Sequence, residues 1–560
     1  MRKQKFAALT ACLVAVAILA TACTGGSTSS TPASSSVASE TASSAASTEA
    51  PESSQAAEPS EDGGLSEINL PLSEEKINLT FWKSWSNDYT PDLNDYAVVK
   101  KMEELTNVHV EYITVGAANA KEKYGMMLAS GDIADMVFGN NGCTYPGGGE
   151  KAIADKVYLD MTDLVEQYMP NYREMRVLDE TIRKMTVTDT GKIWAVYMLR
   201  STDDLEIIPE PCWVGMMLRG DWLEDLNLEA PHTIDEWHTV LTAFKNEKNA
   251  EAPLMLSRTG IIKNNYFLSA YGVLEEFYNA NGTVKYGPLE DGYRQYLELM
   301  NQWYSEGLVD PNFISNEVTY TVPADYMATG KAGAGSGSWA VTTDVYRQDG
   351  RATDPNFTLL SVPGPVLNAG DVCQARNPSY ATVTPTSISA KCEYPEIAAQ
   401  WLDLQYTQIG MESNSYGVEG ETFTKEGGKY AYTDVIMEPT DNRTPQTAQF
   451  SYIMGDHVGL VNWERFNLTN SPEALASRDV WEADGMSLVM PEISLTDAEG
   501  LEFNTLFTDI QTFAQEKTAA FIMGNESFDN YDAFIESLKS MNVERCIELQ
   551  QAALDRYNAR

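Results

Sequence analysis

Histidine and positive charge are both scarce in this chain of 560 residues. The 4 histidines form no H-E-x-x-H motif, and no G-x-S-x-G motif occurs, which argues against zinc-dependent hydrolysis and serine esterase chemistry. With 81 acidic and 39 basic side chains the formal net charge is -42, so the long-range field repels nucleic acid and anionic lipid. We therefore expect no nucleic-acid partner.

Cysteine is also sparse, and its spacing excludes a disulfide framework and a zinc site. The cysteines beyond the N-terminal region are odd in number and contain no C-x-x-C pair. We expect free thiols, no cofactor and no bound metal. The small numbers of histidine and cysteine residues do not exclude a glycoside hydrolase, because that chemistry needs only two carboxyl groups at a suitable separation. The cysteines are Cys143, Cys212, Cys373, Cys392 and Cys546.

The N-terminus has the pattern of an export signal. Arg2, Lys3 and Lys5 precede an apolar run from Phe6 to Ala20, and Ala20-Thr21-Ala22 offers small residues to a signal peptidase. The run is short for a membrane span. Residues 1–22 are therefore predicted to be a signal peptide.

The segment Leu19-Ala20-Thr21-Ala22-Cys23 resembles the lipobox of bacterial lipoproteins, in which the cysteine sulfur receives a diacylglycerol. Ala20 stands where such motifs usually carry leucine, and ordinary secretory cleavage is the alternative. Residues 23–64 are rich in Ser, Thr, Ala, Pro and Glu and cannot build a core. We predict a lipid anchor at Cys23 and a disordered tether with a reach of roughly 35 Å. The body would then lie at the extracellular face of the cell membrane.

From residue 65 onward the chain is too long for one hydrophobic core and alternates strand-like with helix-like patterns. A strand is predicted within 77–89, which alternates through Phe81 and then turns polar, and a second strand at 108–115. Residues 136–142 are a short apolar run closed by Asn and Gly. This alternation favours a doubly wound parallel sheet, whose ligands gather beyond the carboxyl ends of the strands. Trp85, Asn140 and Asn141 follow strand ends and are candidate ligand-binding residues.

The tryptophans divide into core candidates and site candidates. Trp237, Trp303 and Trp401 fall on apolar stripes with helical spacing and are predicted to be core. Trp339 follows the glycine-dense run 330–338, where backbone can approach another surface closely, and it is either a binding platform or a surface-capping side chain. Trp213 and Trp463 are further ligand-binding candidates.

Several stretches together resemble the family 1 extracellular solute-binding proteins, more narrowly the large lipoproteins of Gram-positive bacteria that serve carbohydrate ABC importers. The resemblance runs from about residue 77 to the C-terminus. The stretches are LTFWKSWS, MMLASGDIADMV, MMLRGDWLEDLNLEAPHTIDEWHTVLTAF, YLELMNQWYSEGLVDPNF, ATGKAGAGSGSW, YPEIAAQWLDLQYTQIG with YGVEGETF, and the tail FIMGNESFDNYDAFIESLKSMNVERCIELQQAALDRY.

The resemblance implies an α/β fold of the type II periplasmic-binding kind, with two doubly wound lobes, a hinge and a ligand cleft between the lobes. Residues 65–195 with 377–408 would form one lobe, and residues 196–376 with 409–560 the other. The implied function is that a monomer captures an oligosaccharide and delivers it to ABC importer permease subunits, without enzymatic activity. A tethered glycoside hydrolase and a peptide-binding lipoprotein or adhesin are the alternatives.

Three further expectations concern the ligand. Similar proteins often carry a calcium loop after the DEWxxxLxAF helix, but residues 245–253 (KNEKNAEAP) lack its oxygen spacing, so no calcium is expected there. Aromatic rings, amides and carboxylates suit a neutral glycan better than a strongly anionic one. Trp339 should stack on a sugar ring and be exposed in the open form, so Trp339→Ala should weaken binding more than folding.

Overall fold

The structure is a computed structural model that describes residues 68–85, 92–209, 212–256, 265–315, 324–340, 342–376, 381–441 and 443–560. The predictions for the signal peptide, Cys23 and the tether lie outside these residues. Within them, no helix has the length and apolar character that a membrane crossing requires.

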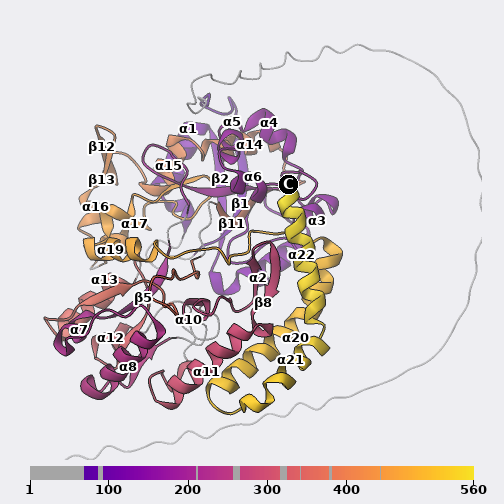
Figure 1. Cartoon of the computed structure of the whole chain (residues 1–560). Coiled ribbons are helices and arrows are strands. Elements are labelled where there is room, and N and C mark those ends of the chain that lie inside the picture. Colours follow the sequence, from indigo (N-terminus) through magenta and orange to yellow (C-terminus); the bar gives the residue numbers. More distant parts are fainter. Residues whose placement is uncertain are drawn as a thin grey trace, which may run out of the picture. The chain divides into compact units, whose positions relative to one another are not determined.

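The first main sheet has six strands in the order β14-β4-β11-β3-β1-β2. Figure 1 labels β1, β2 and β11 of this sheet. β1 pairs in parallel with β2 and β3, β4 pairs in parallel with β14, and β11 runs antiparallel to β3 and β4. The five strands that share one direction therefore end at the same edge, which we call the carboxyl edge. The strands are β1 (Ile77–Ser84), β2 (Val108–Val115), β3 (Met136–Phe138), β4 (Val196–Ser201), β11 (Ala381–Ile388) and β14 (Leu460–Asn462).

Helices between these strands bury their apolar faces against the sheet. α1 buries Val98 and Met102 and ends at Asn107, whose left-handed backbone (φ 56°) turns the chain into β2. Trp401 in α14 is 2% exposed in the same core, which confirms its predicted role. The helices are α1 (Ala97–Thr106), α2 (Ala120–Ser130), α3 (Gly148–Ala154), α4 (Thr162–Tyr168), α5 (Pro170–Arg176), α6 (Glu180–Met185), α14 (Pro395–Leu404), α15 (Gln408–Ser415), α16 (Asp434–Met437) and α17 (Pro445–Gln449), with the hairpin β12 (Phe423–Glu426) and β13 (Lys429–Tyr432).

The second main sheet has four strands in the order β10-β5-β9-β6. It is mixed, because β5 runs antiparallel to β9 and β10 whereas β6 runs parallel to β9. The glycine-dense run forms the buried strand β9, where a Cβ atom at Gly333 would lie 2.3 Å from the Phe244 ring. Glycine thus permits the close packing that the run suggested. The strands are β5 (Val214–Arg219), β6 (Ala252–Met255), β9 (Ala332–Ser338) and β10 (Leu359–Val362).

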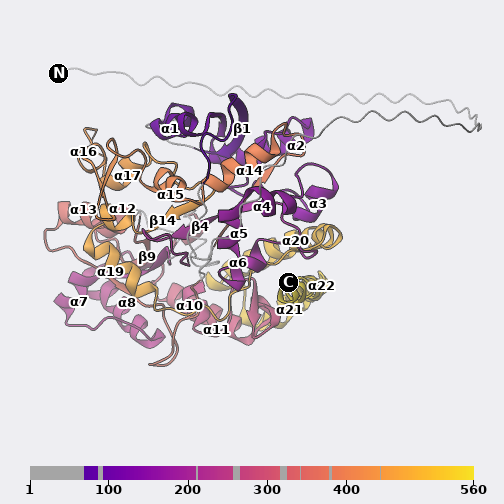
Figure 2. The ribbon, with the colours of Figure 1, turned by 90° about the horizontal axis from the view of Figure 1, so that it is seen from above.

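Helices from distant parts of the chain cover the second core (Figure 2). α20 contacts both α11 and α22. Trp237 and Trp303 are fully buried in this core, as predicted. The remaining elements are α7 (Gly220–Leu226), α8 (Ile234–Lys248), α10 (Asn265–Ser269), β7 (Phe277–Ala280), β8 (Thr283–Tyr286), α11 (Asp291–Ser305), α12 (Ala324–Ala328), α13 (Thr343–Thr353), α18 (Phe466–Thr469), α19 (Pro472–Trp481), α20 (Asp497–Ile522), α21 (Tyr531–Ser540) and α22 (Val543–Ala559).

The six-stranded sheet draws on more of the chain than the predicted lobe boundaries assign to it. β4 and β14 lie beyond the predicted limits at residues 195 and 408, yet both strands pair in this sheet. Met411 and Tyr416 also pack in its core. The α/β class is confirmed, while the division into lobes stays a proposal, in which we place residues 68–201 and 381–462 around the six-stranded sheet.

Candidate functional site

Two of the predicted site residues, Asn140 and Asn141, hold the carboxyl ends of β3 and β1 together. The Asn140 amide accepts from the Ser84 backbone N–H (3.0 Å) and donates to the Ser84 carbonyl oxygen (2.8 Å). The Asn141 amide donates to the Ser84 hydroxyl (2.8 Å). Both side chains therefore stabilise the contact between the ends of β1 and β3. Their role in ligand binding stays a prediction.

Trp85 follows β1 at the same edge and is partly buried. Its ring lies 6.2 Å from the Tyr96 ring in an edge-to-face arrangement, and Lys83 Nζ lies 4.7 Å from the Trp85 ring centroid. Within the described residues, the buried Trp85 indole N–H has no hydrogen-bond acceptor. A buried donor without an acceptor is unusual and is a position that a ligand oxygen can satisfy.

The other three candidates meet at the junction of the two sheets. Trp463 follows β14, Trp213 precedes β5 and Trp339 follows β9. The Trp213 ring lies 6.0 Å from Trp339 in a stacked arrangement and 4.6 Å from Trp463 edge-on, and Phe466 completes the group. We call Trp213, Trp339, Trp463 and Phe466 the tryptophan cluster.

Trp339 differs from the expectation of an exposed platform. Its side chain is 1% exposed, and its indole N–H donates to the Cys212 carbonyl oxygen (2.8 Å). The ring is enclosed because β9 is a buried strand that delivers Trp339 directly against Trp213. Trp213 is the more accessible of the two rings and is partly buried. A role of Trp339 in ligand binding stays a prediction, but the expectation of an exposed ring was wrong.

Sequence reasoning missed three buried cations at or just beyond the carboxyl edge. Lys83 in β1 is 0% exposed, Arg200 in β4 is 4% exposed, and Arg465, three residues after β14, is 2% exposed. Arg200 lies over the Trp463 ring at 4.8 Å and Arg465 over the Phe466 ring at 4.7 Å. Lys83 and Arg200 lie in strands and over the rings of Trp85 and Trp463, which the sequence had singled out, so a charge at the end of an apolar strand was the available signal for these two. No such signal marked Arg465.

Burial sets the electrostatics of these groups. Burial lowers the pKa of Lys83 from 10.5 to about 7, although the negative charge of Asp456 acts in the opposite direction. The Lys83 ammonium donates to the Asp456 backbone carbonyl oxygen (2.9 Å). Burial and the nearby Lys83 also lower the pKa of His457 well below its ordinary value, so His457 is neutral. The carboxyl edge therefore combines aromatic faces with poorly solvated hydrogen-bond donors.

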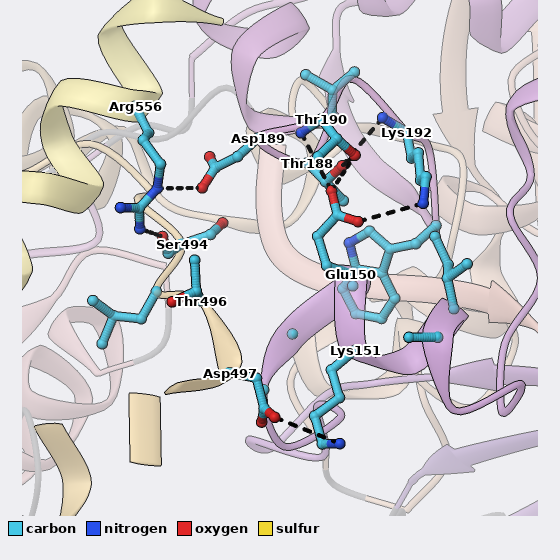
Figure 3. A pocket seen from close by; sticks show the side chains of 18 of the residues that line it. Glu150, Lys151, Thr188, Asp189, Thr190, Lys192, Ser494, Thr496, Asp497 and Arg556 are labelled. Carbon is cyan, nitrogen blue, oxygen red and sulfur yellow. Dashed lines mark hydrogen bonds and ion pairs between the residues drawn. The ribbon is translucent and has the colours of Figure 1, made fainter. Parts of the chain in front are cut away.

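A hollow lies beside the start of β4 (Figure 3). It encloses about 780 Å³ and is lined by Trp194 and Tyr197 together with α3, residues 187–192, residues 492–497 and Arg556. Many of its charged side chains are paired with one another, such as Lys151 with Asp155 (2.9 Å) and Lys192 with Glu150 (3.6 Å). It lies away from the carboxyl ends of the strands, so we regard the carboxyl edge as the candidate binding site.

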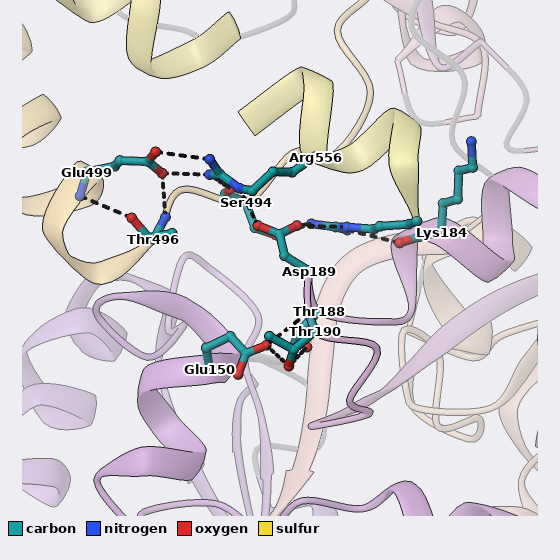
Figure 4. A network of polar contacts seen from close by, with 10 residues as sticks. Glu150, Lys184, Thr188, Asp189, Thr190, Ser494, Thr496, Glu499 and Arg556 are labelled. Atoms are coloured by element: carbon teal, nitrogen blue, oxygen red, sulfur yellow. Dashed lines mark hydrogen bonds and ion pairs between the residues drawn. The ribbon is translucent and has the colours of Figure 1, made fainter. Parts of the chain in front are cut away.

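The wall of this hollow contains a network of ion pairs (Figure 4). Arg556 contacts Asp189 and Glu499 at 2.6 Å each, and Arg560 contacts Asp189 at 2.6 Å. Arg556 also donates to the Ser494 carbonyl oxygen (3.1 Å). We call Asp189, Glu499, Arg556 and Arg560 the paired network. It ties the last helix, α22, to the turn that precedes β4.

Metal binding has no support among the described residues, where no group of three or more His, Cys, Asp or Glu side chains is suitably placed. In the segment 245–253, Lys248 Nζ is 2.6 Å from Asp225 and Lys245 donates to the Glu306 carbonyl oxygen. The absence of calcium at this segment stays a prediction.

Comparison with known proteins gives consistent matches. The sequence model of the bacterial extracellular solute-binding proteins matches residues 89–412. The chain is 21% identical to the fructooligosaccharide ABC transporter substrate-binding protein FusA of Streptococcus pneumoniae serotype 4, covering 89% of this chain and 94% of that protein. It is 20% identical to lipoprotein LipO of Bacillus subtilis, covering 79% and 85%. The crystal structure of the alginate-binding protein AlgQ2 without calcium ion superposes with a TM-score of 0.66 at 21% identity, covering 86% of this chain and 99% of AlgQ2.

Proposed function

We propose that this chain, which belongs to the bacterial extracellular solute-binding proteins, captures an oligosaccharide and delivers it to the permease subunits of an ABC importer. As the solute-binding component of a transporter it is not an enzyme. The glycoside hydrolase alternative is therefore set aside. FusA, which is named for fructooligosaccharide transport, supports a carbohydrate as the solute.

The tryptophan cluster is the observation that carries the proposal. Sugar rings present C–H faces that pack on aromatic side chains, and their hydroxyls need polar partners nearby. Trp213 and Trp463 meet at 4.6 Å at the junction of the two sheets, and Trp463 directly follows β14 at the carboxyl edge. We propose that the glycan lies at this junction, between two lobes that close on it by a hinge motion.

The binding test is a thermal-shift and calorimetric screen of neutral and acidic oligosaccharides against the protein without its signal peptide. Trp213→Ala should weaken binding of whichever glycan is found by about tenfold or more, because a stacked aromatic anchor is lost. Trp303→Ala is the control, since Trp303 is fully buried in the second core and should change melting but not affinity. If no oligosaccharide binds, the proposal fails.

We further propose that Cys23 carries a lipid anchor that holds the protein at the extracellular face of the membrane. The lipobox-like segment before Cys23 and the name of the relative LipO support this assignment. Cys23→Ala should move the protein from the membrane fraction to the medium or leave an uncleaved precursor. Unchanged fractionation, with no acyl mass on the mature N-terminus, would contradict the anchor.

A further inference from the structure

Arg465 is a buried cation that pairs with no carboxylate in the part of the chain that the structure describes, although the charge of Asp456 acts on its pKa. Its side chain is 2% exposed, and within the described residues it forms no salt bridge. Its Nε and Nη1 atoms are buried, and no described residue offers either of them a hydrogen-bond acceptor. The guanidinium stays protonated in proteins and has only donors, so such a position is costly unless a partner arrives.

Other buried arginines of this chain have hydrogen-bond acceptors. Arg176 donates to the Thr186 hydroxyl (3.2 Å), and two arginines donate to carboxylates. Arg219 and Arg347 are each 4% exposed, close to the exposure of Arg465. Arg219 donates to the Asp221 carboxylate (2.8 Å), and Arg347 donates to the Asp344 carboxylate (3.1 Å). Arg219 and Arg347 are thus buried to a similar extent as Arg465, and each of them is paired with a carboxylate. Arg465 differs from both in this respect.

The surroundings of Arg465 add positive charge and further donors. Arg200 is close enough to lower the pKa of Arg465 beyond the effect of burial, and Asp456, which opposes this shift, also acts on Lys83. Asp456 is exposed, and its backbone carbonyl oxygen is the acceptor for Lys83. Nearby at the junction, the Trp463 indole N–H and the Ser201 hydroxyl are buried and lack partners within the described residues. The carboxylate of Asp203 at the same junction is already used, because it accepts from the Asn462 amide (2.7 Å) and the Tyr416 hydroxyl (2.8 Å). The groups left without partners among the described residues are therefore donors, and one of them is the Arg465 cation.

We infer that the captured glycan carries a carboxylate, as a uronic acid residue does, and that the buried cations beyond the carboxyl edge, with Arg465 foremost, bind it. A carboxylate accepts hydrogen bonds through two oxygens and brings the missing negative charge, whereas a neutral hydroxyl brings no charge. This inference rests on the proposed function and specifies its ligand. It departs from the expectation of a neutral glycan, which rested on the aromatic rings, amides and carboxylates of the sequence and did not consider the buried cations.

The experiment compares each acid with its own neutral ester. Oligomers of galacturonate, glucuronate and mannuronate, each beside its methyl ester, are titrated calorimetrically into the chain from Thr24 to the C-terminus, along with neutral oligosaccharides. At least one acid should bind at least about tenfold more tightly than its ester. If a neutral oligosaccharide binds and no acid exceeds its ester, the inference is wrong while the proposed function stands. If nothing in the panel binds, both fail.

Variants test the assignment to Arg465. Arg465→Gln should reduce the affinity for the acid about tenfold or more and leave the affinity for its ester unchanged, whereas Arg465→Lys should retain part of the preference. Arg347→Gln is the matched control, equally buried but paired in the native protein, and it should keep the ratio of acid to ester affinities. An unchanged ratio in both glutamine variants would overturn the role of Arg465.

Proton uptake gives a second readout that does not depend on the folding of a variant. A bound carboxylate would favour the charged form of Lys83, which faces the rings of Trp85 and Phe138, the Asp456 carbonyl and the neutral His457. Titrations at pH 8 in buffers of different ionisation enthalpy should show protons taken up with the acid and none with its ester. Equal proton uptake for the two would contradict a carboxylate bound near these cations.

Discussion

The paired network and the carboxyl edge both contain buried arginine side chains. In the paired network these arginines form ion pairs with carboxylates, whereas Arg465, just beyond the carboxyl edge, forms none with any described residue. In the paired network Arg560 is 2% exposed at its side chain and shares Asp189 with Arg556, which also contacts Glu499 (Figure 4). Just beyond the carboxyl edge Arg465 is 2% exposed, and the described residues provide neither a paired carboxylate nor an acceptor for two of its nitrogens. Depth of burial alone therefore does not distinguish a paired arginine from an unpaired one.

The difference suggests separate roles for the two regions. A fully paired cation stabilises a contact between segments distant in sequence, here α22 and the turn before β4. An unpaired buried cation costs stability, which is acceptable where a ligand supplies the partner. We expect substitutions in the first region to act on folding. Substitutions of unpaired groups in the second should act on binding, and some of them should stabilise the free protein.

The largest change in the free energy of unfolding should come from Trp339→Ala. This variant tests how much the side chains near the carboxyl edge contribute to the stability of the fold. Because the ring is 1% exposed and contacts Trp213, Trp463 and Phe466, its removal should lower the free energy of unfolding by about 3–5 kcal/mol. Urea unfolding measures this loss, with Trp213→Ala as the partly buried comparison that should lose less. Wild-type stability of Trp339→Ala would mean that the ring is not enclosed in solution.

The second-largest change in the free energy of unfolding should come from Asp189→Asn in the paired network. The change removes the negative charge that Arg556 and Arg560 share, and the Arg560 side chain is 2% exposed. We expect a loss on the order of 2 kcal/mol, less than for a fully buried pair because the Asp189 side chain is 15% exposed. Asp555→Asn is the control, an exposed carboxylate in α22 whose loss should change urea unfolding little. Equal stability of the two variants would show that the network contributes nothing.

Much of the fold could be predicted from the sequence because periodicity reports burial. The predicted strands near 77 and 108 and the apolar run at 136 appear as β1, β2 and β3, and Trp237, Trp303 and Trp401 lie in the cores. The lobe boundaries were harder, because β14 is a strand of three residues whose partner β4 lies more than 250 positions earlier. Pairing between such distant segments leaves no local pattern.

The candidate site could be predicted only in part. The sequence named Trp213, Trp339 and Trp463 as separate candidates, and only the structure shows that their rings meet. Their exposure could not be read from sequence, because the enclosure of Trp339 depends on Cys212 and Phe466 from other segments. The buried cations were missed for a related reason. A lysine or arginine is normally at the surface, and only the structure shows which of them lacks water and a partner.

The third effect should be a gain in stability that depends on pH. Lys83→Met removes a buried ammonium whose pKa falls from 10.5 to about 7 in the folded protein. The unfolded chain binds this proton more readily between these two values, so the group costs most below pH 7 and the cost fades as pH rises toward 10.5. We expect Lys83→Met to raise the free energy of unfolding by about 1–2 kcal/mol at pH 6. The gain stays this small because methionine cannot make the hydrogen bond that Lys83 donates to the Asp456 carbonyl.

Urea unfolding of wild type and Lys83→Met at pH 6 and pH 9.5 measures this gain. The advantage of the variant should shrink at the higher pH, where folded wild type holds Lys83 neutral. Lys76→Met is the control, since Lys76 is exposed and its pairing with Glu103 at the surface should add little at either pH. An advantage of the same size at both values would place Lys83 in contact with water.

The smallest effect should come from Arg478→Gln, a cation that covers the tryptophan cluster from outside. The Arg478 guanidinium lies 5.6 Å from the Trp339 ring and contacts Asp479 at 3.0 Å, where the Asp479 side chain is 67% exposed. Exposed ion pairs and exposed contacts between a cation and a ring each contribute little, so the loss in free energy of unfolding should stay within about 0.5 kcal/mol. Binding of a carboxylated oligosaccharide should also change less than in Arg465→Gln, since water already solvates the Arg478 charge. Urea unfolding and the same calorimetric titration measure both quantities. A loss of affinity equal to that of Arg465→Gln would show that positive charge near the cluster matters in general and that the burial of Arg465 does not.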